Sequence, residues 1–174
     1  MFKQTLFQIN YFHMPVLKFK DKKKKLVNLL KSFPEKKHGL QNFSTNRQID
    51  RTGLADGFTQ IVGEELQMLS KDIQLDLAMS DIWSVSYAKG DYHSPHNHGS
   101  LGLSGILYLD MPEGAPVTHY IQPWNQHLSD TTLYLPMNVR EGDIVILPSF
   151  INHFSPPNKG KGKKRIISWD MKYM

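Results

Sequence analysis

Hydrophobic residues recur at two different periods along the chain, and the period changes near residue 80. Between residues 21 and 33, four large apolar residues follow the i, i+3, i+4, i+7 spacing of one helix face, and Pro34 ends the pattern. They are Leu26, Leu29, Leu30 and Phe33. A second helical pattern extends from about residue 54 to 70. We therefore expect two amphipathic helices in the first half of the chain.

After residue 80 the chain consists of short alternating or continuous apolar runs that are separated by clusters of Gly, Pro, Asn and Asp. The runs cover 82–88, 103–110, 117–121, 132–136, 143–148 and 165–171. This pattern predicts an antiparallel sandwich or barrel, with the early helices packed on one sheet. We expect a single domain over residues 1–174, with a helical support region (1–80) and a β core (81–174).

Composition excludes several chemistries. The chain has no cysteine, so disulfides, zinc–thiolate sites and thiolate catalysis are ruled out. No apolar run approaches the ~20 residues of a membrane helix, and residues 1–15 lack the features of a signal peptide. We expect a soluble, cytoplasmic protein. The net charge of +5 is concentrated in lysine runs at 18–25 and 158–165, which we interpret as solvated surface; a nucleic-acid partner and the oligomeric state stay open.

Three histidines suggest a metal site. His96 and His98, in "HSPHNH", would lie on the same face of an extended strand. Such a pair needs a third ligand from another strand. His153 is the candidate, because it follows a predicted strand and has Ile151 and Phe154 as apolar neighbours. A buried imidazole requires a specific partner. We therefore predict that His96, His98 and His153 bind a metal ion.

The segments "GDYHSPHNHGSLGLSGILYLDMPEG" and "GDIVILPSFINHFSPPNKGKGKKRIISW" together resemble the Fe(II)- and 2-oxoglutarate-dependent oxygenases, and most closely their small bacterial and phage branch. The resemblance extends over residues 82–171. It implies a double-stranded β-helix, which is a cupin-like jelly roll. It also implies an Fe(II) centre that binds 2-oxoglutarate as cosubstrate, releases succinate and CO2, and hydroxylates a substrate. The sequence does not name that substrate; a peptide, a nucleobase and a metabolite all stay open.

The resemblance assigns His96 as the first ligand and His153 as the distal one. His98 stands where the usual pattern has Asp or Glu, so the site would have three neutral imidazoles and one positive charge more than the usual set. Asp91 and Asp110 are the nearest carboxylates in the sequence. No catalytic residue beyond the metal ligands is implied.

The resemblance also implies a cation that binds the far carboxylate of 2-oxoglutarate. Arg165, twelve residues after His153, is our preferred candidate, because a guanidinium binds a carboxylate with two hydrogen bonds. A shift of one residue would give this role to Lys164 and turn Ile166, Ser168 and Asp170 to the same face.

Aromatic residues supply the remaining candidates. Tyr87 and Tyr108 are expected to assist the cosubstrate, with core packing as the alternative for both. Trp124 lies in a loop-rich stretch and is a candidate for substrate binding.

Two other functions stay open at this point. The first is a cupin-type dioxygenase, isomerase or lyase that does not use 2-oxoglutarate. The cupin glycine, proline and histidine spacings are met, but Gly102 and Leu103 occupy the place of its glutamate. The second is a jelly-roll binding protein that has a vestigial metal site and no activity, which the missing carboxylate would explain.

Overall fold

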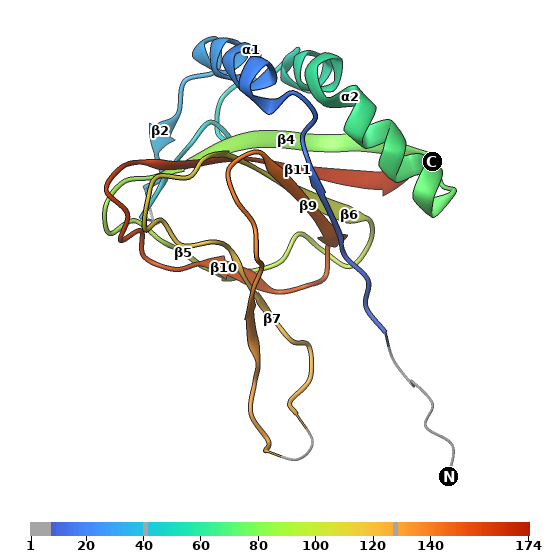
Figure 1. Cartoon of the computed structure of the whole chain (residues 1–174), viewed down its shortest axis with the longest axis vertical. Coiled ribbons are helices and arrows are strands. Elements are labelled where there is room, and N and C mark those ends of the chain that lie inside the picture. The colour runs from blue at the N-terminus through green and yellow to red at the C-terminus, as the bar shows by residue number, and fades with distance from the viewer. Residues whose placement is uncertain (1–7, 40–41, 127–128) are drawn as a thin grey trace.

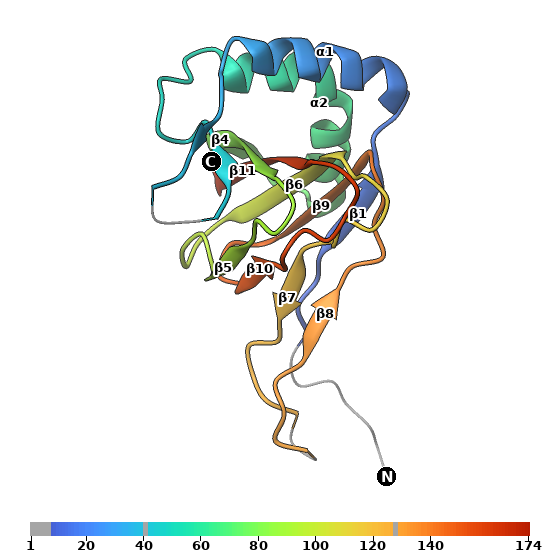
Figure 2. The same cartoon turned by 90° about the vertical axis from the view of Figure 1, so that its left-hand side faces the viewer.

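Two β-sheets face each other, and two helices cover the outer face of the larger sheet (Figure 1). The structure is a computed structural model that describes residues 8–39, 42–126 and 129–174. The predicted mainly-β jelly roll with helices on one sheet is confirmed. Figure 2 shows the same arrangement from the side, with β7 and β8 extending away from the helices.

Both predicted helices are present. Helix α1 (Phe19–Lys31) begins two residues earlier than expected and ends before Pro34, and α2 spans Leu54–Ile73. Leu26 and Leu30 of α1 are buried against the larger sheet. A buried glutamate of α2 forms an ion pair with Lys22 of α1 at 2.9 Å, which fixes the two helices against each other. In the described part of the chain, neither helix is long and apolar enough to cross a lipid bilayer.

The larger sheet has seven antiparallel strands with β11 near its centre. In spatial order they are β1 (Phe12–Pro15), β9 (Asp143–Pro148), β6 (Leu103–Asp110), β11 (Lys164–Tyr173), β4 (Leu77–Tyr87), β3 (Ser44–Thr45) and β2 (Lys36–Lys37). The predicted runs correspond to β4, β6, β9 and β11. The strands that the pattern missed in this sheet, β1, β2 and β3, are short and lie at its edges, where few side chains are buried.

The smaller sheet has the order β5 (His93–His96), β10 (His153–Ser155), β7 (His119–Ile121) and β8 (Tyr134–Pro136). Strands β7 and β8 were predicted, whereas β5 and β10 were not. Each of these two is only three or four residues long and contains histidine. A hydrophobic pattern cannot reveal strands of this kind.

The central strand β11 separates two hydrophobic cores. Ile167 and Trp169 belong to the core beneath the helices, and Ile166 belongs to the core between the sheets. Successive side chains of a strand point to opposite faces. Trp169 packs against Phe58 of α2 and lies opposite Gly105 of β6, because only a residue without a side chain leaves room for the indole.

Replacing Gly105 with alanine should therefore destabilise the fold. The added Cβ would lie 2.1 Å from the Trp169 ring, and overpacking of this kind costs about 1–3 kcal/mol or more. Gly63→Ala in α2 is the matched control, since nothing lies within 4 Å of its added Cβ, and the lower helix propensity of glycine predicts a gain of about 0.5–1 kcal/mol. Urea unfolding measures both free energies. Equal effects of the two variants would contradict this packing account.

Candidate metal centre

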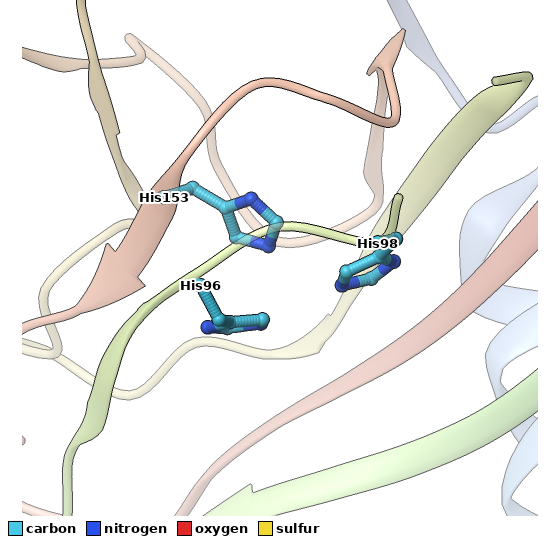
Figure 3. A group of neighbouring side chains, drawn as sticks. All are labelled: His96, His98 and His153. Carbon is cyan, nitrogen blue, oxygen red and sulfur yellow. The ribbon is translucent and has the colours of Figure 1, made fainter. Parts of the chain in front are cut away.

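His96, His98 and His153 lie together between the two sheets (Figure 3). His96 ends β5 and His153 begins β10, and these two residues are paired directly across the antiparallel ladder. The ring centroids of His96 and His153 are 4.4 Å apart, and those of His98 and His153 are 5.1 Å apart. One ring nitrogen from each residue lies within 4.8 Å of the other two.

His98 reaches the group although β5 ends at His96. Its backbone N–H donates to the carbonyl oxygen of Ser149 at 2.9 Å, which ties the segment after β5 to the end of β9. The rings of His96 and His98 are near parallel, with centroids 5.4 Å apart. The expected convergence of this pair is therefore present, but the chain achieves it beyond the strand rather than within it.

The second nitrogen of each ring is already engaged. Nδ1 of His96 lies 2.8 Å from the carbonyl oxygen of Ser94, and Nδ1 of His153 lies 3.0 Å from that of Ile151. A carbonyl oxygen only accepts hydrogen bonds, so both Nδ1 atoms bear the proton. The Nε2 atoms of these two rings then have the free lone pairs that a metal ion needs.

Burial keeps two of the histidines neutral. Loss of solvation lowers the pKa of His153 to about 3, with the nearby His96 adding to the effect, and it lowers the pKa of His96 to about 4. Neutral imidazole is the form that binds metals. Three nitrogens bound to one ion at about 2.1 Å lie at most about 4.2 Å apart, so shifts on the order of 1 Å would close the set around an ion.

The two carboxylates that are nearest to these histidines in the sequence are paired elsewhere and are not part of this group. Asp91 pairs with Lys37 at 2.8 Å, and Asp110 pairs with Lys23 and Arg165, both at 2.8 Å. The carboxylate of Asp170 does contact the group, because its Oδ1 lies 2.6 Å from Nδ1 of His98. Sequence analysis placed Asp170 on this face only in the alternative register of the last strand.

The register of β11 places the two candidate cations on opposite faces of the larger sheet. Arg165 shares a face of β11 with Ile167 and Trp169 beneath the helices, and its guanidinium donates to Asp110 at 2.8 Å. Lys164 shares the opposite face with Ile166 and Ser168, which line the cavity of the histidines. The structure therefore does not bring Arg165 to the histidines, and it places Lys164 on their side of the sheet.

Lys164 is fully buried, and its amine has one polar partner, Ser155 Oγ at 2.9 Å, in the described part of the chain. The amine also lies 5.0 Å from the centre of the Tyr87 ring. Burial lowers the pKa of Lys164 to about 7. A buried ammonium with a single neutral partner is costly, and an anion beside it would remove much of that cost.

Several hydroxyl side chains line the cavity of the three histidines. Tyr87 lines it and forms a side-chain hydrogen bond with Ser155. Thr118 also lines it, and Tyr108 is buried behind it. Among the described residues, the hydroxyls of Tyr108, Thr118 and Tyr120 make no hydrogen bond of good geometry. Buried groups of this kind each cost about 1–3 kcal/mol when unpaired, so the donors present suit a carboxylate. Thr118 and Ser155 were not predicted, because no sequence pattern distinguishes them from other hydroxyl residues.

The space among these side chains is narrow, and a larger hollow adjoins it. The cavity itself holds about 20 Å³, so a five-carbon dicarboxylate enters only if the lining side chains move. A neighbouring hollow of about 240 Å³ shares Trp83, His93 and His96 with the cavity. These three side chains therefore form the wall between the two spaces. His93 stacks on His96 at 3.8 Å between ring centroids. Trp124 lines a separate hollow of about 330 Å³ with Tyr11 and Tyr120. None of the three histidines lines this hollow, but the Tyr120 ring centroid lies 5.9 Å from that of His153.

Comparison with solved structures shows the same fold. An oxidoreductase of the 2OG-Fe(II) oxygenase family from Burkholderia pseudomallei matches with a TM-score of 0.71 at 8% identity, over 93% of this chain and 84% of that one. HygX from Streptomyces hygroscopicus, solved with nickel, 2-oxoglutarate and hygromycin B bound, matches with 0.69 at 12% identity, over 94% and 83%. A prolyl-4-hydroxylase from Pseudomonas putida matches with 0.61 at 12% identity, over 94% and 93%.

A search of curated proteins finds no sequence match. A family model does match: residues 81–170, about half of the chain, fit the family described as "Putative 2OG-Fe(II) oxygenase". The matched range extends from the start of the predicted β core to Asp170, and it includes all three histidines and Lys164. The chain therefore belongs to the family of 2OG-Fe(II) oxygenases, whose cofactor is Fe(II) and whose cosubstrate is 2-oxoglutarate.

Proposed function

We propose that the protein is an oxygenase in which His96, His98 and His153 bind Fe(II) and Lys164 anchors 2-oxoglutarate, so that a substrate in the adjoining hollow is hydroxylated. The main support is the convergence of three imidazole nitrogens within 4.8 Å in a chain of this family. Fe(II) in such a site, with 2-oxoglutarate and O2, supplies the oxidising chemistry that gives succinate, CO2 and an oxidised substrate.

Lys164 takes the role that the sequence assigned to Arg165, because its amine is buried on the inner face of β11. The Arg165 guanidinium is already paired with Asp110 on the other face. Tyr87 would orient the same carboxylate through its hydroxyl group, which shares a hydrogen bond with Ser155. Thr118 and Tyr108 offer further hydroxyl donors. Each donor would exchange an unpaired or weakly paired state for a hydrogen bond to an anion.

The hollow beside His96 is the proposed substrate site. Its walls are largely aromatic, with Phe43 on one side and Trp83 on the other, and Arg47 stacks over the Trp83 ring at 4.0 Å. Trp83, His93 and His96 line both this space and the cavity of the three histidines. In this position they would limit the access of water, which protects a reactive centre. Trp124 is not part of this proposal, since it lines a different hollow.

The anchor can be tested by titrating the apo-protein with Fe(II) and then 2-oxoglutarate without oxygen, while recording the visible charge-transfer band of the chelate. Lys164→Met should retain iron binding but weaken the affinity for 2-oxoglutarate at least tenfold, because the cosubstrate loses the buried cation that we propose as its anchor. Arg165→Met is the matched control and should keep the wild-type affinity. The reverse pattern would show that Arg165 is the anchor after all.

The affinity for 2-oxoglutarate should also depend on pH. Lys164 binds a carboxylate in its ammonium form, and its pKa is lowered to about 7 by burial. The ammonium fraction therefore falls tenfold per pH unit above 7, and the dissociation constant should rise about tenfold per unit between pH 7.5 and 9. Lys164→Arg should abolish this rise, because a guanidinium stays charged. A wild-type profile as flat as that of the arginine variant would contradict the assignment.

Loss of one histidine should remove the activity together with the metal. His153→Ala deletes one of three ligands, so we expect its iron content after anaerobic loading to fall to near zero and Fe-dependent conversion of 2-oxoglutarate to succinate to disappear. His119→Ala is a suitable control, because His119 lies on the neighbouring strand β7 and does not line the cavity. Full iron content in the His153 variant would show that iron binds elsewhere in the protein, and it would favour a non-catalytic jelly roll.

A further inference from the structure

One carboxylate contacts the group of three histidines from behind the His98 ring. Asp170, on β11, places Oδ1 2.6 Å from Nδ1 of His98. The exposed fractions of the two side chains are 16% for Asp170 and 4% for His98. Ser104 of β6 donates to the same carboxylate oxygen at 2.8 Å, and Ser104 is in turn within 2.9 Å of Ser149 Oγ. Two independent contacts thus fix the carboxylate behind the His98 ring.

This contact distinguishes His98 from the other two histidines. His96 and His153 direct Nδ1 to backbone carbonyl oxygens, which are neutral. Only His98 directs Nδ1 to a charged group. A carboxylate in this position accepts the proton of Nδ1 in a hydrogen bond, fixes the orientation of the ring and leaves the Nε2 lone pair for a metal ion.

In the usual pattern of the family a carboxylate occupies the position of His98 as a metal ligand. In this chain the carboxylate of Asp170 is instead hydrogen-bonded to His98. Two imidazoles and one carboxylate bound to Fe(II) give a site with a net charge of +1, whereas three neutral imidazoles give +2. We propose that Asp170 is a positioning residue that acts through His98: it fixes the ring for metal binding and returns one negative charge to the site. This inference rests on the proposed function, because it requires His98 to be a ligand.

A purely structural role would have different consequences. If Asp170 only held β11 against β6 through Ser104, its replacement would lower the stability of the fold and leave the metal affinity of the folded protein unchanged. If it acts through His98, the metal affinity changes even where stability does not. Asp170→Asn separates these cases, because the amide keeps an oxygen that can accept from Nδ1 and from Ser104 but lacks the charge.

The test is an anaerobic titration of the apo-protein with Co(II) alone. Calorimetry measures the affinity, and the visible ligand-field absorption of the bound ion reports its coordination. We expect Asp170→Asn to weaken Co(II) binding about 10–100-fold and to shift the absorption maximum, while the melting temperature of the apo-protein stays within a few degrees of wild type. Asp110→Asn is the matched control: this carboxylate also lies on the larger sheet but pairs with Arg165, so Co(II) affinity should not change.

A double-mutant cycle identifies the route of the effect. In a His98→Gln background, in which the side-chain amide keeps one oxygen ligand but has no Nδ1, Asp170→Asn should have no further effect on Co(II) affinity, because the group through which it acts is gone. An unchanged affinity in the single variant, or an undiminished effect in the double variant, would overturn the role of Asp170. Failure of the wild type itself to bind Co(II) would instead overturn the proposed function, so the two failures are distinguishable.

Discussion

The site depends on the strict alternation of side chains along β11. From Lys164 to Asp170 this strand pairs with β4 without a register shift, so every second residue faces the space between the sheets. Lys164 and Ser168 are placed on that face, and Trp169 is placed beneath the helices, where its indole fills the space opposite Gly105. A slip of one residue would reverse all of these positions. The large tryptophan on one face thus fixes the register of the polar residues on the other.

The second constraint is electrostatic. Three imidazoles lie together in a space where burial lowers the pKa of His96 and His153 far below neutrality. Neutral rings do not repel one another, and their lone pairs are available to a cation. Charged groups surround the three rings: the Asp170 carboxylate is hydrogen-bonded to His98, and the Lys164 amine donates to Ser155, which lines the cavity.

The sequence predicted the jelly roll and the helices because long apolar runs repeat at clear periods. It also predicted which three histidines lie together, since spacing and resemblance agreed. It gave less information on short strands such as β5 and β10, whose pairing brings His96 opposite His153. The choice between Lys164 and Arg165 depends on a register of one residue, and the contact of Asp170 with His98 joins residues 72 positions apart. Neither is encoded in a local pattern.

The most direct test of this account is a crystal structure of the protein with Fe(II) and 2-oxoglutarate, grown without oxygen and measured at the iron absorption edge. The account predicts one anomalous peak about 2.1 Å from a ring nitrogen of His96, His98 and His153, with the far carboxylate of 2-oxoglutarate within hydrogen-bonding distance of Lys164 Nζ. A peak bound to only two histidines, or a carboxylate bound on the face of Arg165, would contradict it.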